Sequence, residues 1–199
     1  YIAPILPKFL DQHPHLTLDL RLSDVPFDLI DGSFDLALRN APLFDTSLKG
    51  RKLADDERIL CAAPGYLAAH GTPATPADLA KHSLIAFRNR EARPLKGPQG
   101  SSGTFEPAAA HNQLIIDDGQ SQIRATLAGA GISLNALWSV HAELASGQLT
   151  RVLPEYRAAD DNVLWLIYPK SNVLSPKVRV FMDFLISEIG KMPPWLDTG

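Results

Sequence analysis

Two closely spaced glycines, Gly129 and Gly131, are the first candidates for chemistry in this 199-residue chain, because glycine-rich turns can cradle the phosphates of a nucleotide. A dinucleotide cradle requires the pattern G-x-G-x-x-G after a strand and before a helix. Here the surrounding residues predict a helix first and a strand afterwards, and Asn135 and Ala136 lie near the place of the third glycine. We therefore interpret the glycines as the end of a helix, where one adopts the left-handed backbone conformation.

The opposite end of the same predicted helix is a better candidate for a binding site. Asp117, Asp118, Gly119 and Gln120 follow a predicted strand and open the helix. In an open parallel sheet, ligands bind beyond the carboxyl ends of the strands, and a helix N-terminus offers backbone N–H donors there. The turn could line a small-molecule pocket, or Asp118 could serve only as the helix cap.

Recognisable catalytic patterns are absent from the sequence. It contains no G-x-S-x-G, H-E-x-x-H, C-x-x-C or P-loop lysine motif, so we predict no catalytic residues, no metal and no cofactor. Cys61 lies in the apolar segment ILCAA, where a thiol pKa is raised, and this favours a core residue over a nucleophile. His13 and His15 flank Pro14, which prevents helical pairing of the two imidazoles as metal ligands.

Composition narrows the class of protein. The net charge of −3 and the pI near 6.1 argue against a free-standing nucleic-acid binder, which would usually show a basic face. A single cysteine excludes an intrachain disulfide and suits a reducing compartment, so we predict a cytoplasmic location. No apolar run is long enough to span a bilayer. The chain opens inside an apparent helix with no signal peptide, so we expect a piece of a longer protein.

Hydrophobic periodicity predicts the elements at the start of the chain. Apolar residues from Ile2 to Leu10 mark one face of a helix, and LTLDLRL over residues 16–22 alternates as a half-buried strand does. Asp24 is a candidate cap for a short helix, and FDLALR over residues 34–39 is a second predicted strand. Together they predict a strand–helix–strand unit with a parallel sheet.

Strands and helices continue to alternate along the rest of the chain, which predicts an α/β fold. We expect loops and a hairpin over residues 88–110, and a final helix capped by Ser175 and stopped by Gly190. The other predicted strands are 59–63, 83–87, 113–117, 132–136, 149–153 and 163–168, and the other predicted helices start at Pro64, Thr75, Asp118 and Leu137.

Seven strings in order across nearly the whole chain carry a family resemblance. They are YIAPILPKFLDQHPHLTLDLRLSD, FDLALRNAPLFDTSLKGRKL, ERILCAAPGYLAAHG, PADLAKHSLIAFR, LAGAGISL, LASGQLTRVLPEY and SPKVRVFMDFL. The chain resembles the effector-binding domain of a LysR-type transcriptional regulator. Relative to the family, the winged helix-turn-helix segment and the strand that normally precedes YIAP are missing from this sequence.

The resemblance implies two Rossmann-like α/β subdomains of the type 2 periplasmic-binding-protein kind, joined by two crossing strands near 59–63 and 165–168. Subdomain I would comprise residues 1–60 and 168–199, and subdomain II residues 61–167. It also implies a small-molecule effector, often an organic or aromatic acid, in the cleft between them. Carried onto this sequence, the ligand-binding residues are Ser23, Asp24, Arg39, Asn40, Phe87, Arg88, Asp118, Gly119, Gln120 and Ser133.

Arg39 is the most specific of these predictions, because a guanidinium at a strand's carboxyl end can bind a carboxylate through two hydrogen bonds. Its alternative role is an ion pair with Asp35 or Asp45. The resemblance further implies a homodimer or homotetramer that uses the first helix, the strand over residues 16–22 and the helix from Gln120 to Leu127. DNA would be contacted only through the missing domain, with no membrane partner.

Three functions remain open at this level. The resemblance favours the sensing module of a transcription regulator. A secreted solute-binding protein of the same fold would instead follow an export signal. An α/β hydrolase or transferase would show turnover, although the sequence offers no paired base and nucleophile.

Overall fold

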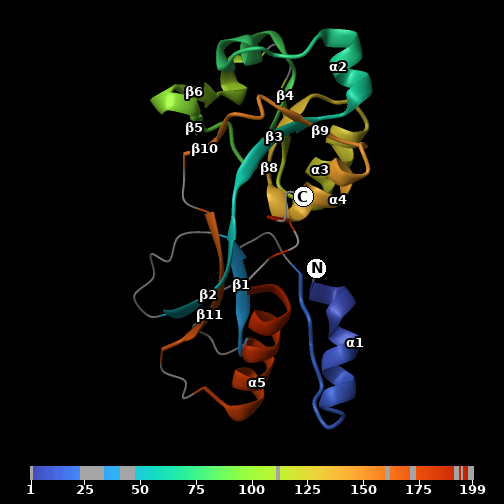
Figure 1. The fold of residues 1–199 in the computed structure, drawn as a ribbon, viewed down its shortest axis with the longest axis vertical. Helices are drawn as coiled ribbons and strands as arrows, with labels where there is room; N and C mark the ends of the chain where they lie inside the picture. The colour runs from blue at the N-terminus through green and yellow to red at the C-terminus, as the bar shows by residue number, and fades with distance from the viewer. Residues whose placement is uncertain are drawn as a thin grey trace. The chain divides into compact units, whose positions relative to one another are not determined.

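The chain folds into two compact units, which we call unit 1 and unit 2 (Figure 1). A computed structural model describes residues 2–22, 34–40, 48–110, 113–159, 162–170, 174–190, 193 and 195–196. Unit 1 comprises Tyr1–Asp55 and Asn162–Gly199, and unit 2 comprises Asp56–Asp161. These divisions fall several residues before the expected ones. The strand β3, Arg58–Ala62, belongs wholly to the sheet of unit 2, and β11, Asn162–Pro169, belongs to that of unit 1.

Unit 1 contains a three-stranded sheet in the order β1-β11-β2, where β1 is Ala37–Asn40 and β2 is Leu48–Asp56. β1 runs antiparallel to β11, with Ala37 opposite Ile167. The helix α5, Pro176–Leu185, continues as a π-helical turn over Ile186–Gly190. The strand predicted over residues 34–39 is present as β1, displaced towards the carboxyl end of the prediction.

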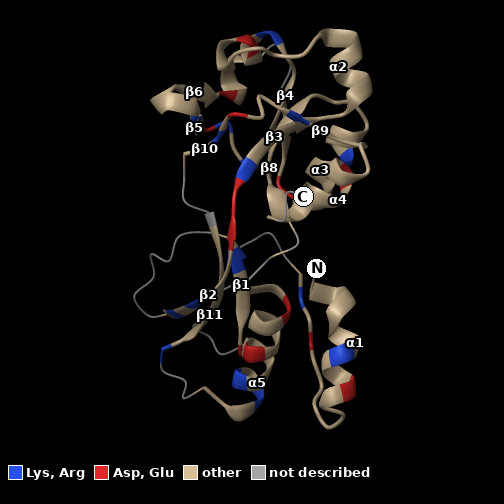
Figure 2. Ribbon diagram, in the orientation of Figure 1, with Lys and Arg blue, Asp and Glu red and all other residues tan. Residues whose placement is uncertain are grey.

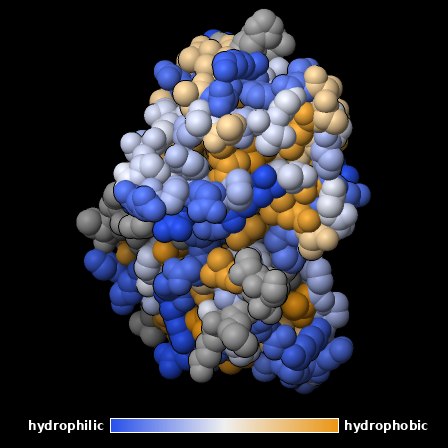
Figure 3. Space-filling view, turned by 45° about the horizontal axis from the view of Figure 1, so that its top comes forward, coloured by the Kyte–Doolittle hydropathy of each residue, from blue (hydrophilic) through white to orange (hydrophobic). Residues whose placement is uncertain are grey.

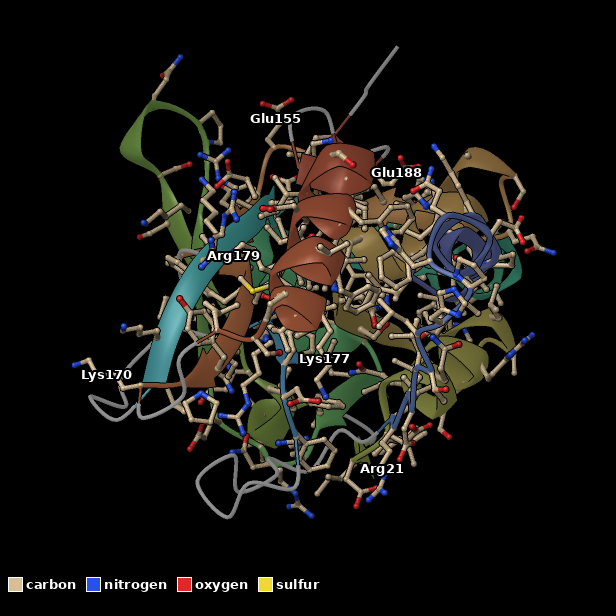
Figure 4. The ribbon with its side chains drawn as sticks, turned by 90° about the horizontal axis from the view of Figure 1, so that it is seen from below. Arg21, Glu155, Lys170, Lys177, Arg179 and Glu188 are labelled. Atoms are coloured by element: carbon tan, nitrogen blue, oxygen red, sulfur yellow. The ribbon has the colours of Figure 1, made fainter. Side chains whose placement is uncertain are left out.

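The helix α1, Ile2–Gln12, packs against α5 through aromatic rings. Phe9 has no exposed surface, and its ring centroid lies 4.9 Å from that of Phe181 and 5.1 Å from that of Phe184. At the surface, Lys8 Nζ lies 2.8 Å from Glu188 Oε1. Figure 4 shows Glu188 near one end of α5 and Lys177 near the other. Aromatic burial thus holds the two helices together, with an ion pair at the rim.

The strand predicted over residues 16–22 is wrong, because this described segment has no regular secondary structure. Leu20 is 47% exposed and Leu22 is 86% exposed. Alternation makes a segment compatible with a sheet, but a strand forms only where a neighbouring strand accepts its hydrogen bonds. The helix predicted after Asp24 lies outside the described residues, so the strand–helix–strand unit is not found as predicted.

Unit 2 is built on a five-stranded mixed sheet in the order β7-β4-β8-β3-β9. β7 and β8 both run parallel to β4, whereas β3 is antiparallel to β8 and β9. The sheet therefore changes from parallel to antiparallel pairing between β8 and β3. The new strands are β4 Leu84–Phe87, β7 Gln113–Ile116, β8 Ile132–Ala136 and β9 Thr150–Val152.

The two faces of this sheet differ in chemistry, because successive side chains of a strand point to opposite sides. Leu60 and Leu134 belong to an apolar cluster that includes Tyr66 of the helix α2, Pro64–His70. Their neighbours Cys61 and Ser133 are paired across β3 and β8, and lie under the helix α3, Gly119–Leu127. The helix α4, Leu137–Ala145, also packs against β8 (Figure 1).

Smaller elements complete unit 2 and confirm two local predictions. A hairpin within 88–110 joins a second sheet, of order β10-β5-β6. The predicted cap Thr75 donates its backbone N–H to Asp78 at 3.0 Å, although the helix that follows is a short 3-10 helix. The remaining bounds are β5 Arg93–Lys96, β6 Ser102–Phe105, β10 Arg157–Ala158, and 3-10 helices η1 Pro76–Lys81, η2 Pro98–Gly100 and η3 Pro107–Ala109.

The glycine motif ends α3, as predicted. Gly129 has φ +81°, and its N–H donates to Thr126 O, while Ala130 N–H donates to Ala125 O, both at 3.0 Å. This is the Schellman pattern, which pairs carbonyls that the helix end would leave without donors. The geometry thus uses these glycines to turn the chain from helix to strand.

The surface is mixed in charge and hydropathy. Figure 2 shows basic and acidic residues interspersed, with an acidic run at the end of β2 followed by a basic residue in β3. Hydrophilic residues cover most of the face in Figure 3, and hydrophobic ones show between them. Within the described residues, every helix is too short or too polar to cross a membrane.

Candidate functional site

Two parallel strands of unit 2 end side by side and bring five of the six predicted site residues of this unit together, with Ser133 as the exception. Phe87 at the end of β4 is in register with Ile116 at the end of β7. The next residue, Arg88, donates its backbone N–H to Ile116 O at 2.8 Å. Arg88 and the turn at Asp117 therefore lie at one edge of the sheet, where ligands bind in open α/β sheets.

Arg88 has an uncommon backbone conformation at this edge. Its φ is +63°, a left-handed value that residues other than glycine rarely adopt. Asn89 N–H donates to Phe87 O at 2.7 Å and closes the tight turn. The exposed guanidinium carbon lies 5.1 Å from the centroid of the Phe87 ring, within the range of a cation–π contact. Such strained conformations cluster at ligand sites, and they persist only where the surrounding structure maintains them.

The first turn of α3 forms the other side of this edge. Asp118 accepts the backbone N–H of Ser121 on its carboxylate at 2.7 Å, which confirms its predicted capping role. Asp118 and Gln120 are exposed, and Gly119 is half-buried. The partial positive charge of the helix dipole at this end is offset by the Asp118 carboxylate, so Arg88 is the group at this edge that favours an anion.

Arg39 and Asn40 end strand β1 of unit 1, so they occupy the strand position that was expected of them. Both are half-buried, and Arg39 is in register with Trp165 of β11. Asp35, one alternative partner of Arg39, binds Lys177 Nζ through its carboxylate at 3.1 Å. The predicted site residues Ser23 and Asp24, and the second alternative partner Asp45, lie outside the described residues.

Ser133 occupies the core instead of a ligand-facing edge. It has no exposed surface and is the second residue of β8, opposite Cys61. Its Oγ is 2.7 Å from Thr126 Oγ1 and accepts a hydrogen bond from Asn135 Nδ2 at 2.5 Å. These bonds already use the hydroxyl, so we remove Ser133 from the candidate site.

Sequence reasoning missed the polar residues that connect α3 with the sheet. The sequence offers Ile123 and Leu127 as apolar residues of this helix, whereas its buried residues are Gln122, Ile123 and Thr126. The available signal was the spacing of Gln122 and Thr126, which lie four positions apart and so share one helix face. Polar residues with that spacing ordinarily indicate a solvated face, which is why the signal was weak.

The described groups that could perform covalent chemistry are poorly placed for it. Burial raises the pKa of the Cys61 thiol to about 11, because the charged thiolate is disfavoured away from water. Burial also lowers the pKa of His82, whose Nδ1 lies 3.2 Å from the Tyr66 hydroxyl. Among the described residues, no three His, Cys, Asp or Glu side chains gather as metal ligands would.

A hollow of about 430 Å³ lies elsewhere in unit 2, between α2 and the carboxyl end of α3. His70 stacks on Tyr66 at its wall, with ring centroids 4.4 Å apart. Gln148 and the helix end at Gly129 complete the lining. The hollow contains none of the predicted ligand residues, and Asp118, Gly119 and Gln120 lie at the opposite end of α3.

Each unit consists of a sheet with helices, so the fold belongs to the α/β class. The family model of the LysR substrate binding domain matches residues 1–190. The chain therefore belongs to the LysR substrate-binding domain family.

Known proteins of this family are similar along almost the whole chain. The transcriptional regulator YhjC of Escherichia coli is 32% identical over 98% of this chain and 64% of its own length. The regulator CrgA of Neisseria meningitidis is 30% identical over 95% of this chain and 62% of its own. The chain thus spans less than two thirds of these relatives.

Solved structures agree with this assignment. The CrgA regulatory domain of Neisseria meningitidis has a TM-score of 0.80 at 30% identity, covering 95% of this chain and 92% of that one. Full-length AphB of Vibrio cholerae, described as a virulence activator, has a TM-score of 0.77 at 25% identity, over 94% of this chain and 63% of that one.

Proposed function

We propose that this chain is the effector-sensing domain of a bacterial LysR-type transcription regulator. The carrying observation is the junction of β4 and β7, where the Arg88 N–H to Ile116 O bond brings two predicted ligand segments to one edge. The proposed contacts in unit 2 are Phe87, Arg88, Asp118, Gly119 and Gln120. Those proposed in unit 1 are Ser23, Asp24, Arg39 and Asn40. That both units contact one ligand remains a prediction, which the variants below address.

The proposed effector is a small carboxylate, with an aromatic acid as the favoured case. The Arg88 guanidinium attracts an anion, and the half-buried Phe87 ring offers a surface for a flat apolar group. A guanidinium also matches a carboxylate in geometry, because it donates two parallel hydrogen bonds. Since Arg88 is exposed, its attraction for the carboxylate should weaken as ionic strength rises.

The mechanism we propose is a shift between conformations and involves no reaction. An effector changes such an equilibrium only through the difference in its affinity for the two states. In a regulator of this family the change would reach DNA through a separate DNA-binding segment, in a cytoplasmic homodimer or homotetramer. The proposed contacts between copies are α1 and the helix from Gln120 to Leu127.

A thermal-shift screen tests the proposal directly. Benzoate, salicylate, succinate and malate are added singly to the 199-residue chain, and a bound ligand raises the melting temperature by mass action. The variant Arg88→Asn removes the guanidinium and keeps a residue that tolerates positive φ, so it should reduce the shift. The matched control Arg90→Ala removes an exposed arginine two residues away and should retain it.

Two further outcomes decide the remaining parts of the proposal. If Arg39 and Arg88 contact the same ligand, the losses of affinity in Arg39→Ala and in Arg88→Asn should not add in the double variant. A hit whose affinity survives both substitutions would refute the assigned site. Consumption of a hit compound by the purified chain would instead indicate an enzyme.

A further inference from the structure

The helix α3, which starts at the candidate site, is seated on the sheet mainly by polar side chains. Two of its three buried residues, Gln122 and Thr126, are polar. Neighbouring α4 differs, because its buried residues are the apolar Leu137 and Val140. Beneath α3, the sheet presents two buried polar residues, Ser133 and Asn135, with 0 and 4% exposed surface, beside the buried thiol of Cys61.

These side chains form one hydrogen-bonded chain whose direction follows from counting protons. Thr126 Oγ1 donates its only proton to Gln122 O at 2.8 Å. The contact of 2.7 Å between Thr126 and Ser133 must therefore be a donation from the Ser133 hydroxyl. Ser133 in turn accepts from Asn135 Nδ2, which also lies 3.1 Å from Cys61 Sγ. The one bond of this chain that crosses between sheet and helix is thus donated by the sheet, from Ser133 to Thr126.

A second attachment fixes the helix at another point. Gln122 Nε2 donates to Ile85 O in β4 at 3.3 Å. Sliding α3 by one residue would move it by about 1.5 Å and turn it by roughly 100°, which would break both attachments at once. Apolar packing would tolerate a partial slide, whereas buried hydroxyls without partners are disfavoured strongly. The hydrogen-bonded side chains of Gln122, Thr126, Ser133 and Asn135, which we call the polar seat, therefore specify one position of α3.

The position of α3 decides where the candidate site lies. Gln122 is in the first turn after the cap, and the same helix carries Gly119 and Gln120 at its start. We propose that Thr126, Ser133 and Asn135 are positioning residues, which hold the N-terminus of α3 against the end of β4. The ligand-related part of this inference rests on the proposed function, and the structural part does not.

The first test measures the position of the helix start without any ligand. Thr126→Val replaces the hydroxyl by a methyl group of similar size, so it breaks the chain without opening a cavity. The amide resonances of Gly119 and Gln120, about 10 Å away along the axis, should then shift in a ¹H–¹⁵N NMR spectrum. Thr126→Ser restores the hydroxyl and should return both resonances to their original positions.

Ser139→Ala is the matched control in the same unit. Ser139 Oγ of α4 donates to Ala136 O, at the end of β8, at 2.7 Å and takes no part in the bonds that hold α3. It should lower stability without moving the Gly119 and Gln120 resonances. If Thr126→Val changes only resonances next to residue 126, the hydroxyl is merely structural and the inference is overturned. If Thr126→Val does not fold, Ser133→Ala breaks the same chain without added bulk, and the same outcomes decide.

Cys61 provides a second, built-in probe, because it is the only cysteine and has no exposed surface. A thiol reagent such as dithiobis(nitrobenzoate) reaches it only when α3 or its neighbours open. Thr126→Val should accelerate labelling by roughly 5- to 30-fold over Thr126→Ser. Equal rates in the two variants would contradict the inference.

A final comparison separates the two proposals. If benzoate raises the melting temperature of the unaltered chain, Thr126→Val should weaken benzoate binding and Thr126→Ser should restore it. Absence of benzoate binding together with shifted Gly119 resonances would reject benzoate as a ligand and keep the positioning role. Binding that is unaffected by Thr126→Val would reject the ligand-related part alone.

Discussion

The helices α5 and α3 are attached to their units in opposite ways. The buried residues of α5 are Val178, Met182, Phe184 and Leu185, and Phe9 of α1 packs on its aromatic rings. α3 instead buries a glutamine and a threonine that bond to the sheet. Apolar burial contributes most of a helix's stability and accepts substitutions of similar volume. Buried hydrogen bonds contribute less net free energy but specify geometry.

This difference matches what each helix has to do. α5 covers a sheet in unit 1, and its ion pairs with Asp35 and Arg51 lie at the exposed surface. α3 carries the candidate site at its first turn, so an error in its position would displace Asp118 and Gln120. The comparison predicts that α5 is more sensitive to loss of volume and α3 to loss of a single hydroxyl.

The largest expected effect is at Phe9. Phe9→Ala should lower the free energy of unfolding by about 3–5 kcal/mol, because it empties a fully buried aromatic site. Urea denaturation followed by circular dichroism measures the loss. Phe9→Leu, which retains most of the apolar volume, should cost clearly less. Equal losses in both variants would show that contacts of the aromatic ring, and not its buried volume, hold α1 on α5.

Thr126→Val should lower the free energy of unfolding by about 1–3 kcal/mol, although it makes the buried interface more apolar. The reason is that the buried Ser133 hydroxyl would lose the acceptor of its hydrogen bond. Met182→Leu on α5, a swap of similar volume, should cost less than about 1.5 kcal/mol. Urea denaturation of the two variants compares their free energies of unfolding. An unchanged stability of Thr126→Val would contradict the expected difference between α3 and α5.

Alkaline pH should weaken unit 2 through Cys61. The pKa of this thiol is about 11 in the fold, above its ordinary value of 9.0, so the unfolded chain loses the proton first. Stability is therefore full below about pH 9 and falls as pH rises towards 11, by at most about 2.7 kcal/mol. Cys61→Ala should flatten this part of the stability profile, measured by urea denaturation between pH 8 and 10.5. An unchanged slope would contradict the raised pKa.

The cap of α3 should have a smaller effect. Asp118→Ala removes the acceptor of the Ser121 N–H and should cost about 0.5–2 kcal/mol. Asp118→Asn keeps an oxygen acceptor and should be nearly neutral, and Asp117→Ala at the neighbouring exposed position serves as control. Thermal unfolding of the three variants ranks them. A loss in Asp117→Ala equal to that in Asp118→Ala would point to charge instead of capping.

The smallest effect is expected at the rim of α5. Lys8→Ala breaks the ion pair with Glu188, and should change the free energy of unfolding by less than about 1 kcal/mol. Lys8 is more than half exposed, so water and salt already screen the attraction. Raising the salt concentration should reduce even this difference in denaturation experiments. A larger loss would mean that the ion pair contributes to the packing of α1 on α5.

Local patterns in the sequence determined much of unit 2. The cap at Asp118, the glycine stop at Gly129 and the hairpin within 88–110 were all predicted, because each depends on residues close together in the chain. Family strings added the overall assignment. The ends of β4 and β7 also followed from the pattern, and with them the neighbourhood of Arg88.

Only the tertiary structure decided what depends on distant partners. The alternating leucines up to Leu22 did not form a strand, because hydrogen-bonded pairing requires a second strand that no local pattern contains. Ser133 was assigned to the site from its string, yet it pairs with Cys61, 72 positions away, in the core. The inner face of α3 likewise depends on what the sheet offers at Ser133 and Ile85. Sequence determines local conformation through short-range sterics and capping, whereas burial and pairing are set when distant segments meet.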